Sequence, residues 1–235
     1  MDDNISDSEL YIKSGYEKFA ALDYTGAREE FSKVIELLPK HAISYYMRAQ
    51  AYYHDYLFED AIDDFTQAIE LIHECTEIEE FSDHSGFCTL ELDKILNAYI
   101  SNINKNEILQ SAYYNRSLAR EWVGDFHGAM TDVNISILMN RRNAKAFNQR
   151  GNLKSRIFAF ESAINDFSKA IKIEPKFLDA YCNKAIATIF TQGWDSASIE
   201  WLQAGKIGNT NNYKNKRMYQ FKKDEPDPPE DRTSY

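Results

Sequence analysis

The sequence predicts an all-α fold, a solenoid built from stacked helix-turn-helix hairpins. The segments at 59–71 (EDAIDDFTQAIEL) and 161–173 (ESAINDFSKAIKI) share most of their apolar positions, and they lie 102 residues apart, which is three times 34. Apolar residues in the first segment recur at helical spacing, as in Ile62, Phe65 and Ile69. A 34-residue period of this kind indicates repeated helical hairpins. They must stack, because a single hairpin cannot bury its apolar face.

A frame of 34 residues places five units along the chain, at 8–41, 42–75, 110–143, 144–177 and 178–211. The eighth position of each unit holds a small residue: Gly15, Ala49, Ser117, Gly151 and Ala185. The twentieth position is always alanine: Ala27, Ala61, Ala129, Ala163 and Ala197. Small residues at these positions let the two helices of a hairpin approach closely, while large and mostly aromatic side chains at the fourth and twenty-fourth positions fill the space beside that contact.

This pattern resembles the tetratricopeptide repeat, in the variant written YNRG…DF…A, which appears here as YYNRSLA at 113–119 and FNQRGNL at 147–153. The resemblance covers all five units. It implies a right-handed superhelical solenoid whose first helices line a concave groove that binds segments of partner proteins. The resemblance therefore predicts a non-catalytic scaffold or adapter for protein–protein interaction. A structural module that self-associates into a homo-oligomer is the alternative.

Charge and composition narrow the class of partner. The formal net charge is −10, and nucleic acids and anionic membranes both favour clustered Lys and Arg, so neither is an expected partner. No apolar run approaches the roughly 20 residues that span a bilayer, and the acidic start MDDNISDSEL lacks the pattern of a secretion signal. The three cysteines form no closely spaced framework, which favours reduced thiols and a cytoplasmic location. No catalytic or phosphate-loop motif occurs, so we expect neither enzyme activity nor a cofactor.

A basic residue at the seventh position is followed sixteen residues later by an acidic residue in four of the five units. The pairs are Arg48 with Asp64, Arg116 with Asp132, Arg150 with Asp166, and Lys184 with Glu200. Because every base comes with its own acid, we predict a structural ion pair between the two helices of each hairpin. The alternative is a basic ladder on the groove that holds acidic ligands. The first unit has Ser14 in place of the base and keeps only Glu30.

The groove is predicted to be lined by side chains from one face of each first helix. The partner-binding residues expected there are Tyr16, Tyr46, Gln50, Tyr53, Tyr114, Asn115, Asn148, Asn152 and Asn183. Amides offer donors and acceptors that suit an extended peptide backbone, and tyrosines offer rigid contact area, although several of the tyrosines could equally belong to the core. The residues at the positions of the family's carboxylate clamp do not match it, so an adapter for chaperone tails is not expected.

Residues 76–109 interrupt the repeats, and we interpret them as an insertion because the positions that should be small are not. An amphipathic helix is expected at about 89–104. It is either a structural element or a gate packed near Tyr53 and Tyr114. Four candidate zinc ligands gather around the start of the insertion: His73, Cys75, His84 and Cys88. Their spacing does not match the usual zinc pairings, so no metal site is predicted.

The end of the chain is expected to lie outside the array, which we assign to 1–211. A capping helix is predicted at 212–223, where it would cover the apolar face that the last hairpin leaves open. The stretch 224–235 is acidic and proline-rich, and we expect it to form a disordered tail.

Overall fold

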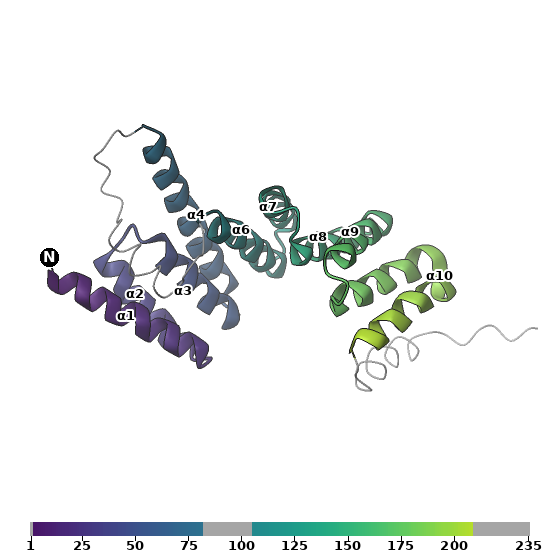
Figure 1. The fold of residues 1–235 in the computed structure, drawn as a ribbon, viewed down its shortest axis with the longest axis horizontal. Coiled ribbons are helices and arrows are strands. Elements are labelled where there is room, and N and C mark those ends of the chain that lie inside the picture. Colours follow the sequence, from purple (N-terminus) through teal and green to yellow (C-terminus); the bar gives the residue numbers. More distant parts are fainter. Residues whose placement is uncertain (1, 82–104, 209–235) are drawn as a thin grey trace, which may run out of the picture.

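The computed structural model describes residues 2–81 and 105–208, and within these ranges it contains helices and no strand. The helices are α1 (Asp2–Ala20), α2 (Tyr24–Leu37), α3 (Ala42–His54), α4 (Phe58–Phe81), α6 (Lys105–Trp122), α7 (Phe126–Met139), α8 (Ala144–Arg156), α9 (Phe160–Ile173) and α10 (Leu178–Gly208). Each helix packs against the next described helix, which produces an elongated array (Figure 1). The prediction of an all-α helical repeat solenoid is confirmed. The helix expected at 89–104, the capping helix and the tail lie outside the described residues.

Short turns join the helices of each hairpin, and side-chain caps mark where several helices begin. Asp23 accepts a hydrogen bond from the Gly26 amide at 2.9 Å, and Asp125 accepts one from the Gly128 amide at 2.8 Å. Such caps satisfy amide groups that have no partner inside the helix. They fix the start of the second helix relative to the turn before it.

The two helices of a hairpin touch where the frame holds its small residues. All five alanines of the twentieth position are fully buried. At Gly15, an added β-carbon would lie 2.9 Å from the Phe31 ring, and at Gly151 it would overlap the Phe167 ring. The aromatic ring of the second helix therefore sits directly on the backbone of the first, which explains why the eighth position stays small.

Helical structure extends from both sides into the expected insertion, because α4 continues to Phe81 and α6 begins at Lys105. In Figure 1 the far end of α4 projects away from the other helices. Nevertheless α4 packs directly against α6. The rings of Phe58 and Trp122 stack at 5.4 Å across this seam. The hairpins before and after the interruption therefore continue one array.

The last described helix, α10, is divided by a kink. Gly193 has φ 81° and ψ 178°, a backbone conformation that glycine alone adopts readily. The part of α10 before the kink packs against α8 and α9. The kink falls where the frame expects the turn of the fifth unit. No helix in the described ranges is long and apolar enough to cross a membrane.

Candidate functional site

The structure brings together the four base–acid pairs that the frame suggests. The bonds are Arg48 Nε to Asp64 Oδ2 at 2.6 Å, Arg116 Nη2 to Asp132 Oδ1 at 2.8 Å, Arg150 Nη2 to Asp166 Oδ1 at 2.8 Å, and Lys184 Nζ to Glu200 Oε1 at 3.0 Å. Each arginine donates a second bond to the other oxygen of the same carboxylate. Planar, two-bond pairing of this kind is the strongest geometry open to a guanidinium.

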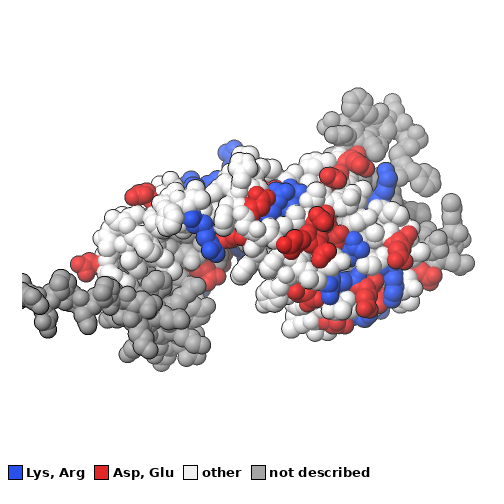
Figure 2. All heavy atoms as spheres, turned by 180° about the vertical axis from the view of Figure 1, so that it is seen from behind, with Lys and Arg blue, Asp and Glu red and all other residues white. Residues whose placement is uncertain are grey.

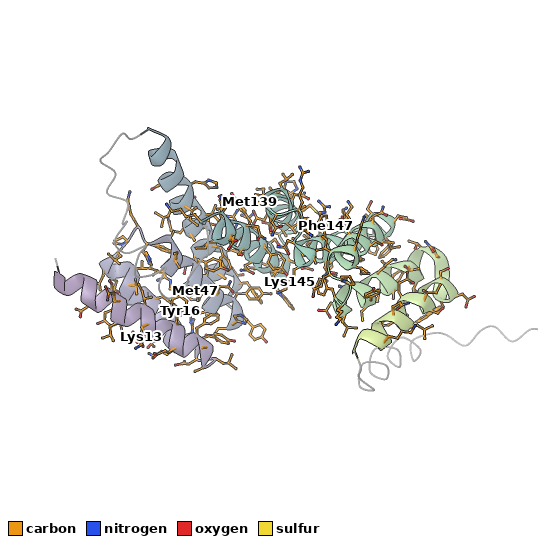
Figure 3. All side chains as sticks on the ribbon, in the orientation of Figure 1. Lys13, Tyr16, Met47, Met139, Lys145 and Phe147 are labelled. Carbon is orange, nitrogen blue, oxygen red and sulfur yellow. The ribbon has the colours of Figure 1, made fainter. Side chains whose placement is uncertain are left out.

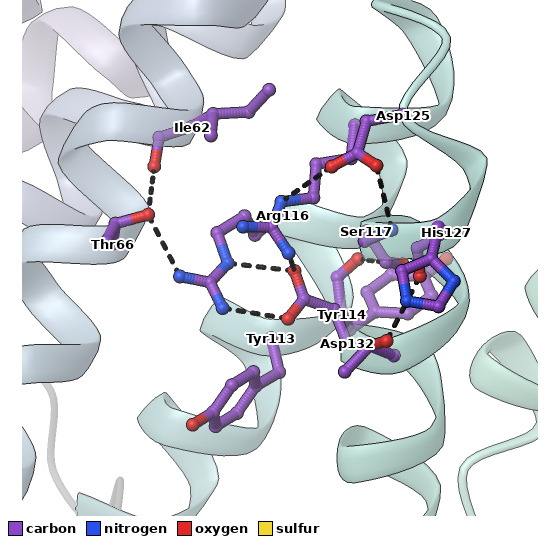
Figure 4. A network of polar contacts seen from close by, with 12 residues as sticks. Ile62, Thr66, Tyr113, Tyr114, Arg116, Ser117, Asp125, His127 and Asp132 are labelled. Carbon is purple, nitrogen blue, oxygen red and sulfur yellow. Dashed lines mark hydrogen bonds and ion pairs between the residues drawn. The ribbon is translucent and has the colours of Figure 1, made fainter.

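Each of these arginines also reaches the preceding hairpin. Arg48 Nη1 donates to Ser32 Oγ at 3.0 Å, Arg116 Nη1 to Thr66 Oγ1 at 2.9 Å, and Arg150 Nη1 to Asn134 Oδ1 at 2.9 Å. Figure 4 shows Arg116 between Thr66 on one side and Asp132 on the other. The guanidinium groups therefore lie in the seams between helices. This geometry favours the structural interpretation over a basic ladder that holds acidic ligands.

A second base, four residues after the seventh position, joins several of the pairs. Arg120 Nη1 lies 3.0 Å from Asp132, and Lys154 Nζ lies 2.6 Å from Asp166. Burial alone would raise the pKa of Asp166, but hydrogen bonds from Arg150 and Lys154 outweigh it and lower the pKa. Among the described residues Arg48 is the cation that pairs with Asp64, and there burial prevails and raises the pKa of Asp64.

In the first hairpin, which lacks a base at the seventh position, the second base pairs with the acid. Ser14 cannot pair with the buried Glu30, and Lys18 takes the place of the base with its Nζ 2.7 Å from Glu30 Oε1. Lys33 adds a contact of 3.2 Å to the same oxygen. The acid of every described hairpin therefore faces a cation.

The tyrosine-rich end of the expected groove is partly filled by its own side chains. The Tyr46 hydroxyl accepts hydrogen bonds from Gln50 Nε2 at 2.7 Å and from Asn115 Nδ2 at 3.2 Å. Tyr16 packs beside Met47 on the core cluster formed by α1, α2 and α3 (Figure 3), and its hydroxyl is buried without a hydrogen-bond partner among the described residues. These side chains are half-buried, and they form part of the wall as much as a binding surface.

Tyr53 and Tyr114 are also half-buried. Tyr53 packs edge-on against Phe58 at 5.5 Å, and burial raises the pKa of Tyr114 to about 12. Neither tyrosine is freely exposed to a ligand. Of the expected groove residues, Asn152 on α8 and Asn183 on α10 border a pocket.

A pocket of about 490 Å³ opens between α8 and the first part of α10. The groove residues Asn152 and Asn183 line it. Asn183 Nδ2 donates to Asn148 Oδ1 at 3.1 Å, which leaves Asn148 buried and the Asn183 oxygen available. The Asn152 carboxamide makes no hydrogen bond to another described side chain. The Asn152 carboxamide and the Asn183 oxygen are therefore available to a ligand in the pocket.

Aromatic residues from the turns form the rim of this pocket. Phe158, Phe160 and Phe190 line it, and the rings of Phe160 and Phe190 stack at 4.7 Å across the two hairpins. At one side, Glu121 Oε1 accepts from Arg156 Nε at 3.3 Å. Its other oxygen accepts from Gln149 Nε2 at 2.7 Å. The charges at the mouth cancel, so the pocket combines apolar walls with neutral hydrogen-bonding groups.

Comparison with known proteins supports the helical-repeat fold. The sequence profile of the tetratricopeptide repeat matches residues 144–177, the hairpin of α8 and α9. The chain therefore carries one hairpin that matches the tetratricopeptide repeat family. Its fold is similar to that of the MamA protein, with a TM-score of 0.63 and 19% identity over 91% of this chain and 96% of that one.

Two further solved structures share the fold. MamA residues 41 to the end from Desulfovibrio magneticus RS-1 give a TM-score of 0.66 at 10% identity, over 87% of this chain and 97% of that one. YrrB, described as a TPR protein with an unusual peptide-binding site, gives a TM-score of 0.61 at 14% identity, over 90% of each chain. At such identities the likeness concerns the fold.

The pocket includes residues that the 34-residue frame of the sequence did not single out. They are Arg156, Phe158, Phe160 and Phe190, all in or beside turns. One signal was available, because the seventeenth position is aromatic in every unit: Tyr24, Phe58, Phe126, Phe160 and Trp194. Aromatic periodicity at the turns is therefore as regular as the small residues inside the hairpins.

Charge and possible metal ligands offer no second site among the described residues. Acidic and basic side chains are interspersed on the described part of the face in Figure 2, rather than gathered in a basic stripe. No described group of three or more His, Cys, Asp or Glu side chains is placed to hold a metal ion. Of the four candidate zinc ligands, only His73 has a described side chain, and its Nε2 lies 3.2 Å from the Tyr113 hydroxyl oxygen.

Proposed function

We propose that this protein is a non-catalytic interaction scaffold that binds an extended peptide segment of a partner protein between α8 and α10. The observation that carries the proposal is the pocket in which Asn152 and Asn183 lie below an aromatic rim. A pocket of a few hundred Å³ with apolar walls and a few polar groups is typical of binding sites. The tetratricopeptide repeat fold and the likeness to YrrB support a peptide as the ligand.

The chemistry of the pocket suits a peptide backbone. The Asn152 carboxamide can donate to a backbone carbonyl and accept from a backbone amide, and the Asn183 oxygen can accept as well. A side chain of the bound segment would pack against Ile186 and Phe190, which line the same pocket. Because these groups stand on two packed helices, binding requires little rearrangement of the protein.

The experiment selects ligands from a displayed library of random twelve-residue peptides on the full chain and measures their affinity by calorimetry. Asn152→Ala is expected to weaken the selected peptides about tenfold, the loss that accompanies one or two buried hydrogen bonds. Asn165→Ala is the matched control, because Asn165 is an exposed asparagine on the second helix of the same hairpin. Equal affinity for both variants would place the peptide elsewhere and contradict the proposal.

Self-association is the second candidate, and the exposed apolar side chains of Ile199 and Leu202 on the last described helix favour it. Light scattering over a dilution series distinguishes the two. Self-association through this helix predicts an oligomer that persists on dilution. The double variant Ile199→Ser with Leu202→Ser should then be monomeric. A chain that remains monomeric at every concentration removes the second candidate.

A further inference from the structure

We propose that the partner segment is proline-rich and binds in the polyproline II conformation along the edge of the array formed by the turns inside the hairpins. We call this surface the turn edge and define it by Leu22, Tyr56 and Phe158 together with the ring pairs described below. This inference rests on the proposed function, because it names the class of peptide that the same pocket takes. It extends the binding surface beyond the pocket along the array.

The first observation is that three large apolar residues occupy left-handed backbone positions in the turns. Leu22, Tyr56 and Phe158 have φ values of 63°, 62° and 61°. In this region the β-carbon crowds the following carbonyl, so bulky residues seldom adopt it. Their side chains gain little in return, since they are 70%, 77% and 79% exposed. Gly124, at the equivalent place in another hairpin, has φ 84° and shows which residue the backbone alone prefers.

Such a combination points to a role outside the fold. Tyr56 and Phe158 each make one edge contact with a neighbouring ring. A residue that is both conformationally unfavourable and mostly exposed adds little to the core, whereas glycine would adopt this backbone at no steric cost. The large side chains are therefore explained best by contact with another molecule. Phe158 supports this directly, because it stands on the rim of the pocket that contains Asn152.

The second observation is a stacked ring pair at three of the four junctions between the described hairpins, the junction of α7 and α8 being the exception. Tyr24 stacks on His54 at 4.7 Å, Phe58 on Trp122 at 5.4 Å, and Phe160 on Phe190 at 4.7 Å, with interplanar angles of 10°, 1° and 9°. Trp122 and Phe190 each remain more than half exposed. The rings are therefore held in fixed orientations while one face or edge stays open to a ligand.

The spacing of these junctions selects the conformation of the ligand. From the second hairpin on, the first helices of neighbouring hairpins contact one another, so we expect consecutive junctions there to lie about 8–10 Å apart, the usual distance between packed helices. A polyproline II helix has three residues per turn and rises about 9.3 Å per turn, so every third side chain meets the next junction. A β-strand places side chains of one face about 6.6 Å apart, and an α-helix repeats every 5.4 Å or so. Polyproline II matches best.

The chemistry of the edge agrees with a proline-rich segment. Proline rings pack on aromatic faces, and the preformed polyproline II helix loses little conformational entropy on binding. Arg156 and Glu121 neutralise one another at the pocket mouth, so the pocket requires no charged ligand. The carbonyl groups of such a segment all remain free, and the Asn152 amide can donate to one of them.

The test uses the full chain and two fluorescein-labelled peptides, one of nine prolines and one of alternating glycine and serine with the same length. Fluorescence anisotropy is expected to show at least about tenfold tighter binding of the proline peptide. Phe158→Gly is the informative variant, because its expected effects on stability and on peptide affinity have opposite signs. The melting temperature should rise by about 2–4 °C as the unfavourable backbone is relieved, while affinity for the proline peptide falls at least about fivefold.

Phe190→Ala should weaken binding similarly, and Leu138→Ala is the matched control. Leu138 is an exposed large apolar residue on α7 and does not belong to the turn edge, so its variant should bind like the wild type. Equal affinity for the proline and glycine–serine peptides would overturn the inference. Unchanged binding by Phe158→Gly, or a fall in its melting temperature, would overturn it as well.

The result also separates this inference from the proposed function. Library-selected peptides that depend on Asn152 but contain no proline pattern would leave groove binding intact and remove the proline-rich partner. Selected peptides whose affinity is the same for Asn152→Ala and wild type would contradict the proposal of groove binding itself.

Discussion

The Arg116 guanidinium and the Asp132 carboxylate meet between α6 and α7 through two hydrogen bonds of 2.8 Å, and their side chains are only 10% and 1% exposed. Taking two charges out of water is costly, and their attraction repays that cost only when the geometry is good and the remaining donors have partners. Here Thr66 takes a remaining donor of Arg116 and Arg120 lies beside Asp132. The pair is thus one part of a connected network.

A double-mutant cycle should reveal this dependence. Arg116→Met is expected to lower the free energy of unfolding by about 3 kcal/mol, because the buried Asp132 then keeps only Arg120. Combining Arg116→Met with Asp132→Leu should recover part of the loss, giving a coupling energy of about 1–3 kcal/mol in denaturant unfolding. The cycle at Lys40 and Glu74, an exposed pair at 3.7 Å, is the control and should give about zero. Coupling no larger at Arg116 than at Lys40 would contradict the prediction.

The bond between hairpins can be tested with a single isosteric change. Thr66→Val removes the oxygen that accepts from Arg116 Nη1, and we expect the free energy of unfolding to fall by about 1–3 kcal/mol because a charged donor loses its partner. Thr131→Val is the matched control. Thr131 donates to a carbonyl four residues earlier in its helix, as Thr66 does, but no arginine among the described residues donates to it. If both variants lose the same stability, the contact between hairpins contributes nothing.

His41 should make stability depend on pH. Burial lowers the pKa of His41 from 6.5 to about 4, so between these values the unfolded chain binds more protons than the folded chain. The free energy of unfolding should therefore decrease as the pH falls from 6.5 to 4, by up to about 3 kcal/mol. His41→Asn, which keeps a residue suited to the start of α3, should remove this part of the slope. The matched control is His127→Asn, which makes the same substitution at an exposed histidine of α7.

The close contact inside the fourth hairpin predicts a large effect of one methyl group. Gly151→Ala would place a β-carbon into the Phe167 ring, which is almost fully buried, so we expect a loss of about 1–3 kcal/mol in thermal or denaturant unfolding. Gly15→Ala should cost less, since the equivalent approach to Phe31 is 2.9 Å. A stabilised Gly151→Ala variant would show that the helices can separate without penalty.

Much of this fold could be predicted from the sequence because its features are local and repeated. The small residue at Gly151, the alanine at Ala163 and the base–acid spacing of Arg150 and Asp166 each depend on residue type at a fixed distance along the chain. Repetition in register multiplies a weak signal. The hairpins and their pairings follow from it.

The contacts between hairpins were harder to predict, because they depend on the rotation of one hairpin against the next. The bond from Arg116 to Thr66 and the pocket beside Phe190 belong to this class. No spacing in the chain records that rotation. The packing of large rings sets this rotation. The same packing half-buries the tyrosines that were expected to line the groove.

The seam between α4 and α6 suggests that the intervening chain can be shortened. Replacing 82–104 with twelve residues of glycine and serine should preserve helicity and the stack of Phe58 on Trp122, because a linker of that length spans up to about 40 Å. Circular dichroism would report the helicity. The change in tryptophan emission, compared with the change in a Phe58→Ala variant, would report the ring stack. Loss of helicity would show that the replaced residues are needed by the array.

In most repeat proteins, hairpins that pack together also follow one another directly in the sequence. Here α4 and α6 pack together although 23 residues of chain lie between them. Closing a longer loop costs only about 0.6 kcal/mol for each doubling of its length. A folded guest domain with neighbouring ends could therefore be housed between Phe81 and Lys105 while α4 and α6 keep their contact. The array could then carry an inserted sensor or enzyme domain at this position, while the pocket beside α10, two hairpins away, keeps its shape.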